Sequence, residues 1–256
     1  MVIESLLKQP KQTDTRDVFV SWSGGKDCCL SLYRAMKQGL NVRYLTSIVT
    51  EDTGRIWPHM MRPEVIEAQA EAIGIPFIKW WTTVPEYEER YKEMLSMLKE
   101  KGITGGVFGD VSIGNDLAER HRKWVDSVCR PLGVDYYLPL WNEDRETMLN
   151  DLIDKGFKAV IIAADEINLG SDWLGLELDN KLLAELKNRH DNSPDGEVGA
   201  YHTLVVDGPV FKKRVEITKS DKVLYRGIWY LDIRECRLLD KRLDNSQVIK
   251  EMAYQR

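Results

Sequence analysis

The feature that most constrains this chain is the run Ser23-Gly24-Gly25-Lys26-Asp27-Cys28 between an apolar triplet and a helical pattern. The triplet at 18–20 predicts a buried strand, and apolar residues at helical spacing from residue 29 onward predict a helix. The two glycines permit the tight turn that must join them. A helix that begins at such a turn directs backbone N–H groups and its positive dipole end toward the turn. The run therefore predicts an anion site, to which Lys26 adds a full positive charge.

The order of the residues excludes the Walker A loop. That loop requires glycine, four residues, and then Gly-Lys followed by serine or threonine. In this chain Val20 occupies the first glycine position and Asp27 follows the lysine. A lysine followed by an acid suits a loop that holds pyrophosphate together with magnesium. The alternative is a strand–helix turn that uses glycine for its geometry alone.

The run resembles the SGGxDS loop of the ATP pyrophosphatases in the adenine-nucleotide alpha-hydrolase superfamily. Cys28 stands where serine is usual, and a thiol is a weaker hydrogen-bond donor than a hydroxyl. A thiol at a helix start is either reactive through a lowered pKa or a half-buried structural group. The resemblance and the strand ends together predict ATP-binding residues at Ser21, Ser23, Gly24, Gly25, Lys26, Asp27, Cys28, Val49, Thr50 and Gly109.

Charge and cysteine usage narrow the class of protein. The 256 residues carry a formal net charge of −5, whereas a protein that tracks a nucleic-acid backbone is usually basic. The four cysteines form no C-x-x-C pair, which argues against a zinc ribbon and fits a reducing cytosol. The N-terminus lacks the apolar core of a signal peptide, and no run is long enough to span a membrane. We expect a soluble, cytoplasmic protein, and the sequence leaves a homodimer open.

The order of expected elements predicts the fold class. Strands at 18–20, 42–49, 77–80 and 107–110 alternate with helical patterns, which predicts an α/β fold with a parallel, Rossmann-like (HUP-type) sheet and helices on both faces. The pattern changes near residue 140. Strand-like stretches at 201–206, 215–218, 223–230 and 231–239 follow, with a hairpin turn expected at Ser220-Asp221. We expect a nucleotide-binding domain at 17–139 and a smaller α+β subdomain at 140–256.

Acidic side chains lie at the ends of two expected strands. Thr50-Glu51-Asp52 stands at the end of the second strand, and Gly109-Asp110 ends the fourth. Ligands in open α/β sheets bind beyond the carboxyl ends of the strands, so both segments should border the nucleotide. Asp27 and Asp110 are the expected magnesium ligands, although an aspartate at this place can also begin a helix. For His121 we expect a structural role.

Further runs resemble one branch of the superfamily, the diphthine–ammonia ligase family with its archaeal and bacterial ATP-binding relatives. In that family a loop of the C-terminal half usually carries a second glutamate and then a further acid. Ala200 and His202 stand at these two places in this chain, which is more similar to bacterial paralogues of uncertain substrate. The matching runs are Phe108-Gly109-Asp110, His121-Arg122-Lys123-Trp124, Leu138-Pro139-Leu140-Trp141, Asp172-Trp173-Leu174-Gly175, residues 196–203 and Asp207-Gly208-Pro209.

The resemblance implies a ligase that attacks the α-phosphorus of ATP with a carboxylate, releases pyrophosphate, and lets ammonia displace AMP. Lys26 and Asp110 would act at the phosphates with Mg²⁺, while Glu197 and His202 would position the acceptor or ammonia, unless they only stabilise their loop. The acceptor would be diphthine-modified elongation factor 2 or an unidentified small carboxylate. Two alternatives are tRNA sulfuration, which the acidic charge and missing C-x-x-C pair disfavour, and a non-catalytic ATP-binding sensor.

Overall fold

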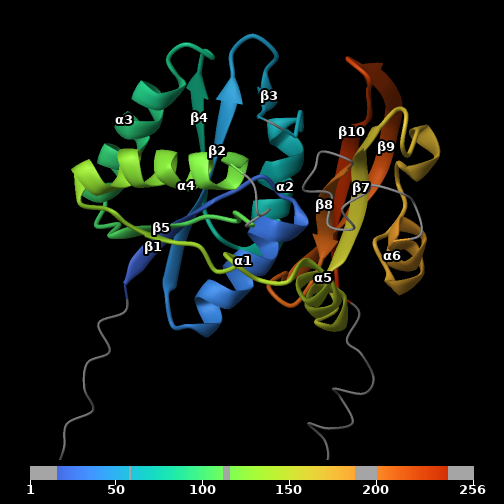
Figure 1. The fold of residues 1–256 in the computed structure, drawn as a ribbon, viewed down its shortest axis with the longest axis horizontal. Coiled ribbons are helices and arrows are strands. Elements are labelled where there is room, and N and C mark those ends of the chain that lie inside the picture. Colours follow the sequence, from blue (N-terminus) through green and yellow to red (C-terminus); the bar gives the residue numbers. More distant parts are fainter. Residues whose placement is uncertain (1–15, 58, 112–115, 188–200, 242–256) are drawn as a thin grey trace, which may run out of the picture.

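The computed structural model describes residues 16–57, 59–111, 116–187 and 201–241. Two sheets lie side by side, and the helices α1 (Lys26–Lys37) and α2 (Pro63–Ile73) lie between them (Figure 1). Helix α1 contacts the second sheet through β8 (Tyr201–Asp207), and α2 contacts its two long C-terminal strands. Within the described ranges, no helix is both long enough and apolar enough to cross a bilayer.

The first sheet is parallel except for one short strand. Its order is β3-β2-β1-β5-β6, with β4 paired to β2, so that β1 lies between β2 and β5. Such an order brings the carboxyl ends of β1, β2 and β5 together at one edge. The strands are β1 (Asp17–Ser21), β2 (Asn41–Thr50), the antiparallel β3 (Arg55–Ile56), β4 (Phe77–Thr82), β5 (Gly105–Val107) and β6 (Asp135–Tyr137).

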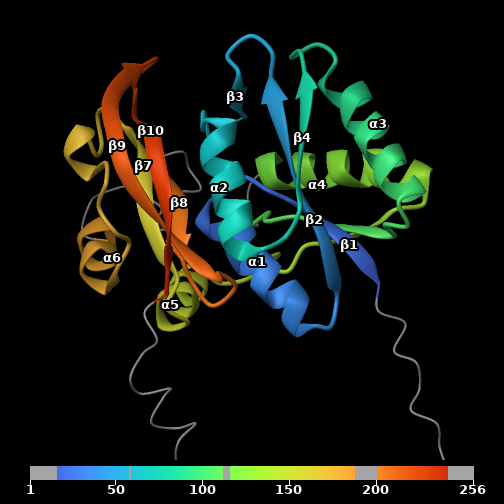
Figure 2. The same ribbon diagram turned by 180° about the vertical axis from the view of Figure 1, so that it is seen from behind.

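Helices cover both faces of this sheet. Helices α3 (Tyr87–Glu100) and α4 (Asp116–Cys129) lie on the face opposite α1 and α2, as Figure 2 shows from behind. A short 3₁₀ helix at Arg130–Leu132 follows α4. The predicted parallel α/β sheet with helices on both faces is confirmed.

The second sheet is antiparallel and has the order β8-β7-β10-β9. Helix α6 flanks it on the side away from the first sheet (Figures 1 and 2). This part agrees with the predicted α+β subdomain. Its remaining elements are α5 (Arg145–Asp154), β7 (Lys158–Asp165), a 3₁₀ helix at Ser171–Trp173, α6 (Asn180–Lys187), β9 (Lys213–Tyr225) and β10 (Ile228–Asp240).

The predicted hairpin turn at Ser220-Asp221 is wrong. Both residues lie inside β9, where Ser220 pairs with Ile233 and Asp221 with Asp232 of β10. The chain turns instead at Arg226 and Gly227, whose φ angles are 51° and 78°. A two-residue turn with positive φ at both positions matches the right-handed twist of the flanking strands. The strand expected at 223–230 is therefore divided between β9 and β10.

The two sheets share one hydrophobic core. A single cluster of buried side chains extends from Val18 and Val20 of β1 through Ile66 of α2 to Leu204 of β8 and Ile233 of β10. A second cluster fills the space between the first sheet and helices α3 and α4. The division at residues 139 and 140 stays a prediction.

Candidate nucleotide site

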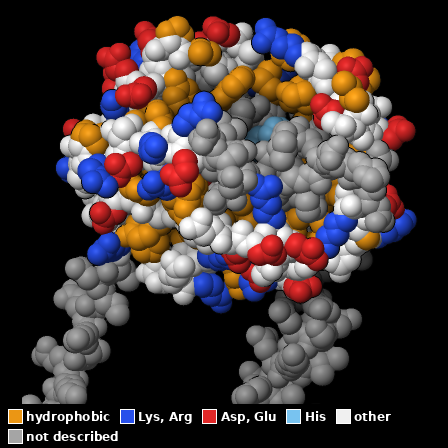
Figure 3. Space-filling view, viewed as in Figure 1, with side chains coloured by type: hydrophobic (Ala, Val, Ile, Leu, Met, Phe, Trp, Pro, Cys, Tyr) orange, Lys and Arg blue, Asp and Glu red, His pale blue; other side chains and the backbone are white. Residues whose placement is uncertain are grey.

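A cavity of about 450 Å³ lies at the carboxyl ends of β1, β2 and β5. Its size is typical of a small-ligand site. In the space-filling view, histidine atoms are visible at the bottom of a hollow (Figure 3). The lining comes from both halves of the chain: the end of β1 and the loop after it, the middle of β2, the segment before α2, the segment after β5, helices α3 and α4, and the start of β8.

Residues 23–28, here called the phosphate loop, join β1 to α1. Gly24 has a φ of +80°, and a Cβ on it would lie 2.5 Å from Cδ1 of Ile66, so the turn requires glycine. Gly25 is the N-cap of α1 and has no side chain to accept from the first-turn N–H groups. The positive end of the helix dipole therefore lies at the cavity, which suits a bound anion.

Gln69 of α2 fixes the phosphate loop from behind. Its side chain is fully buried and accepts a hydrogen bond of 2.8 Å from the indole N–H of Trp22. Its amide donates to the Gly24 carbonyl at 2.9 Å and to the Val205 carbonyl at 2.7 Å. The backbone N–H of Val205 also donates to the Gly24 carbonyl, at 2.9 Å. The conformation of the loop thus depends on α2 and on the second sheet.

Lys26 and Asp27 place a pair of opposite charges at the cavity. Lys26 is 5% exposed, its Nζ lies 2.8 Å from Oδ2 of Asp27, and its backbone N–H donates to the Thr203 hydroxyl at 3.1 Å. Cys28 is buried; its thiol accepts from the Ser23 hydroxyl at 3.5 Å and donates to the Gly25 carbonyl at 3.2 Å. Burial opposes ionisation of the Cys28 thiol, but hydrogen bonds with Cys29 and Ser23 outweigh it and lower the pKa of the thiol.

Asp110 and His121 form a second polar pair in the cavity. Oδ1 of Asp110 contacts Nδ1 of His121, and this hydrogen bond raises the pKa of the histidine. Gly109 allows the segment after β5, which carries Asp110, to approach α1 closely. A Cβ on Gly109 would lie 2.8 Å from the backbone nitrogen of Cys28. The structure therefore places His121, for which the sequence favoured a structural role, in the cavity lining.

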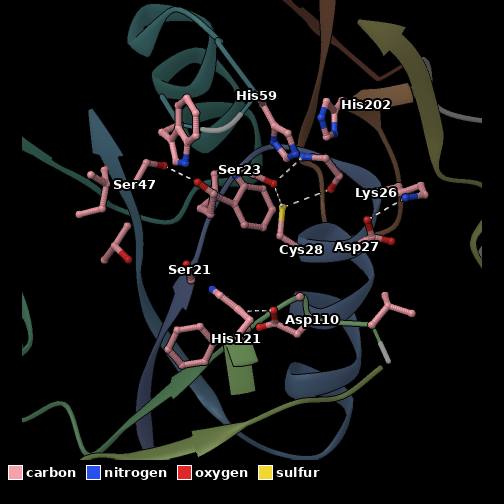
Figure 4. Close-up of a pocket in the computed structure, with 18 of the residues that line it drawn as sticks. Ser21, Ser23, Lys26, Asp27, Cys28, Ser47, His59, Asp110, His121 and His202 are labelled. Carbon is pink, nitrogen blue, oxygen red and sulfur yellow. Dashed lines mark hydrogen bonds and ion pairs between the residues drawn. The ribbon is translucent and has the colours of Figure 1, made fainter. Parts of the chain in front are cut away.

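His59 and His202 meet at another side of the cavity. Their ring centroids are 4.5 Å apart, and Figure 4 shows them next to each other, away from Asp110 and His121. Burial lowers the pKa of His59 to about 4, although a backbone hydrogen bond with Ser23 opposes this effect. Burial and the neighbouring His59 and Lys26 lower the pKa of His202 well below its usual value. Both rings are therefore neutral at neutral pH.

The structure brings most of the predicted site residues together. Gly24 lies behind the cavity surface, Val49 is buried in the core, and the Thr50 hydroxyl bonds that of Thr53, so none of these three lines the cavity. Glu197 lies outside the described residues. The predicted residues that do line the cavity are Ser21, Ser23, Gly25, Lys26, Asp27, Cys28, Gly109, Asp110 and His202.

Sequence reasoning missed several residues of the site. Thr46, Ser47 and Ile48 of β2 line the cavity in place of Val49 and Thr50. His59 was visible only as a histidine in a polar loop. Gln69 carried a clearer signal, a polar side chain on an otherwise apolar helical face. The α3 residues Tyr87, Tyr91 and Met94 also line the cavity.

Within the part of the chain that the structure describes, no group of three or more His, Cys, Asp or Glu side chains could hold a metal ion alone. Asp27 and Asp110 both line the cavity. Magnesium in phosphate-transfer sites usually takes one or two carboxylates and completes its shell with phosphate oxygens and water. The two aspartates fit that kind of shared site.

Comparison with known proteins agrees with the organisation of the chain. Residues 16–136 match the diphthamide synthase N-terminal domain, and residues 144–239 match the diphthamide synthase C-terminal domain. The first range contains the phosphate loop, Asp110 and His121, and the second contains the second sheet with His202.

Proteins named diphthine–ammonia ligase are similar over most of this chain. The one from Schizosaccharomyces pombe is 30% identical over an alignment of 237 residues that covers 84% of this chain and 38% of that protein. The Bos taurus protein is 26% identical over 87% of this chain and 91% of its own length, and the Homo sapiens protein is 25% identical over the same shares. Among solved structures, the crystal structure of a predicted subunit of tRNA methyltransferase from Methanocaldococcus jannaschii matches with a TM-score of 0.43. The match has 18% sequence identity and covers 75% of this chain and 97% of that one. The two domain matches and the ligase relatives show that this chain belongs to the diphthamide synthase family.

Proposed function

We propose that this protein is an ATP-dependent amide ligase that adenylates a carboxylate with release of pyrophosphate, after which ammonia displaces AMP. One observation carries the proposal: a Gly-Gly-Lys-Asp helix start opens directly on a cavity that also holds a strand-end carboxylate. The first feature suits a polyphosphate and the second suits its metal ion. The names of the relatives supply the class of reaction.

The residues of the phosphate loop would act on the leaving pyrophosphate. Lys26 and the N-terminus of α1 lie where negative charge would accumulate, and fixed positive charge in a partly dry site stabilises such a transition state. Asp27 and Asp110 would hold Mg²⁺, which supplies further charge neutralisation when bound. Asp27 is paired with Lys26, so a phosphate that binds Lys26 would release the Asp27 carboxylate for the metal.

The family suggests one acceptor, and one residue of this chain suggests another. Relatives named diphthine–ammonia ligase favour diphthine-modified elongation factor 2 as acceptor and ammonia as nitrogen donor. His202, which stands where the family usually has an acid, instead favours a paralogue that activates another small carboxylate. Glu197 stays our proposed acceptor-positioning residue. For His202, which the resemblance gave the same role, the contact with His59 beside the phosphate loop favours a role at the phosphates instead. A nucleotide sensor is the remaining alternative, and it predicts ATP binding without turnover.

The test is the identity of the products. Purified protein with ATP, Mg²⁺, ammonium and diphthine-modified elongation factor 2 should form AMP and pyrophosphate, measured by chromatography. Lys26→Ala should reduce turnover by about 100-fold or more, a loss typical of a removed transition-state charge. Lys79→Ala is the matched control, because Lys79 lies on the surface, where it pairs with Glu67. ADP as the only product would refute the proposed chemistry, and unchanged turnover in Lys26→Ala would refute the role of the loop.

A further inference from the structure

The paired histidines lie against the phosphate loop itself. His59 precedes α2 and His202 belongs to β8, and the two rings meet with centroids 4.5 Å apart. A Cβ built on Gly25 would lie 3.6 Å from Cε1 of His59 and 3.2 Å from the Thr203 carbonyl. The two rings and the helix start therefore border the same part of the cavity, where the terminal phosphates of a nucleotide would lie.

One nitrogen of His59 has no hydrogen-bond partner among the described residues. The ring makes a hydrogen bond with the backbone of Ser23, and this bond raises the pKa of the ring. Such an effect is expected when the backbone group is a carbonyl that accepts from the ring N–H. Nδ1 is buried, and no hydrogen-bond partner for it lies in the described ranges. If Nε2–H donates to the Ser23 carbonyl, the neutral ring carries its lone pair on Nδ1. A buried acceptor without a partner costs free energy, and a ligand or a proton would remove that cost.

The backbone holds His59 in this place. The next residue, Met60, has a φ of 56°, which is costly for a side chain of its size. The segment is anchored on both sides, because Arg55 and Arg62 each bond the carboxylate of Asp232 on β10, at 2.7 Å and 2.9 Å. Strain that the surrounding structure maintains is common where a side chain must be presented to a ligand.

The charges around the pair favour neutral rings only while the cavity holds no anion. Lys26 disfavours protonation of both rings, and its own charge is balanced by Asp27. The other titratable groups that line the cavity are Cys28 of α1, Tyr201 of β8, Tyr87 and Tyr91 of α3, and Asp110 with His121 on another side. A bound triphosphate would introduce several negative charges close to the rings and reverse this balance.

We propose that the His59–His202 pair is a phosphate-binding element that takes up a proton from solvent when a nucleoside triphosphate binds and then donates hydrogen bonds to its terminal phosphates. This rests on the proposed ATP binding. Two adjacent imidazolium rings repel each other, so roughly one shared proton per nucleotide is expected. Because the bound state holds more protons than the free protein, ATP affinity rises as the pH falls through the raised pKa of the complex. The rise ends below the pKa of the free pair.

Isothermal titration calorimetry in buffers of different ionisation enthalpy measures the proton directly. Wild-type protein with ATP and Mg²⁺ should take up protons, whereas AMP, which lacks the terminal phosphates, should cause little uptake. His59→Gln and His202→Gln keep hydrogen-bonding side chains that do not titrate, and each should remove most of the uptake that wild type shows beyond the nucleotide's own protons. ATP should also bind these variants with an affinity that depends less on pH.

A second measurement does not depend on the variants. The chain has four histidines, so ring-proton NMR of the wild type can follow each of them. Two signals that titrate far below neutral pH should move to a clearly higher pKa with ATP and not with AMP. ATP binding without extra proton uptake, or with unchanged uptake in both variants, would overturn this inference and leave the proposed function intact. Absence of any ATP binding would overturn both.

Discussion

At the scale of single residues, Gln69 links three parts of the molecule through one side chain. It bonds Trp22 after β1, Gly24 in the phosphate loop and Val205 of β8, and it is fully buried. Gln69→Leu leaves an indole N–H and two carbonyls with fewer partners in a site that water does not reach. We expect a loss of about 3 kcal/mol in the free energy of unfolding, together with weaker ATP binding.

Chemical denaturation and ATP titration of this variant check both effects. Glu71→Leu is the control, because Glu71 lies on the same helix with its side chain exposed and should change stability by less than about 0.5 kcal/mol. Equal stability of the Gln69 variant and the wild type would show that the three hydrogen bonds do not hold the loop.

The sequence allowed the phosphate loop to be predicted, because Gly-Gly-Lys-Asp between strand and helix is a local pattern that satisfies its own geometry. It did not reveal the pairing of His59 with His202. That pair depends on how a loop before α2 and a strand of the other sheet approach each other, and neither segment carries the partner in its neighbourhood. Val49 and Thr50 were expected at the site because they end a strand. The residues that line the cavity, Thr46 to Ile48, instead lie just before them in β2.

At the scale of elements, Asp232 joins β10 to β3 and to the start of α2. Its carboxylate accepts from Nη1 of Arg55 at 2.7 Å and from Nε and Nη2 of Arg62 at 2.9 Å each. The hydrogen bond from Arg62 and the charge of both arginines hold the pKa of Asp232 far below its usual range. The side chain is 10% exposed, so the interaction is only partly screened by water.

We expect Asp232→Asn to lower the free energy of unfolding by about 2 kcal/mol at neutral pH, since two arginines lose their charged partner. The folded-state pKa is depressed, so the stabilisation is present above the unfolded pKa of about 4 and is lost as the pH falls through the folded pKa. The difference between wild type and variant should therefore shrink on strong acidification. Urea unfolding at several pH values measures it.

Glu67→Gln breaks the exposed pair with Lys79 and serves as the control, with an expected cost of less than about 1 kcal/mol. A pH-independent difference for Asp232→Asn would contradict the ionic origin of the effect.

The wrong prediction of the hairpin turn is also explained at the scale of elements. Ser and Asp favour turns, but β9 and β10 are each 13 residues long, and Arg226-Gly227 provides the turn that their twist requires.

At the scale of the whole molecule, the two sheets depend on each other. Strand β8 bonds the phosphate loop through Val205 and Thr203, and the backbone N–H of Lys212 donates to the Ala72 carbonyl at the end of α2 at 2.7 Å. The apolar faces of α1 and α2 pack into a core that also includes residues of β8, β9 and β10. A separate nucleotide-binding unit would expose these faces to water.

We therefore expect the full chain to unfold in one cooperative transition, because loss of either sheet uncovers the core that both share. A fragment of residues 1–139, which ends at the predicted boundary, should be unstable or aggregate and should not bind ATP with the affinity of the full chain. The second sheet supplies both the Val205 bond to the Gly24 carbonyl and the Thr203 hydroxyl that accepts from Lys26, so the phosphate loop of the fragment would lack two of its supports. Calorimetry of the full chain and ATP titration of the fragment check this. Two separate thermal transitions, or a fragment that binds ATP as tightly as the full chain, would show that the nucleotide site is complete without the second sheet.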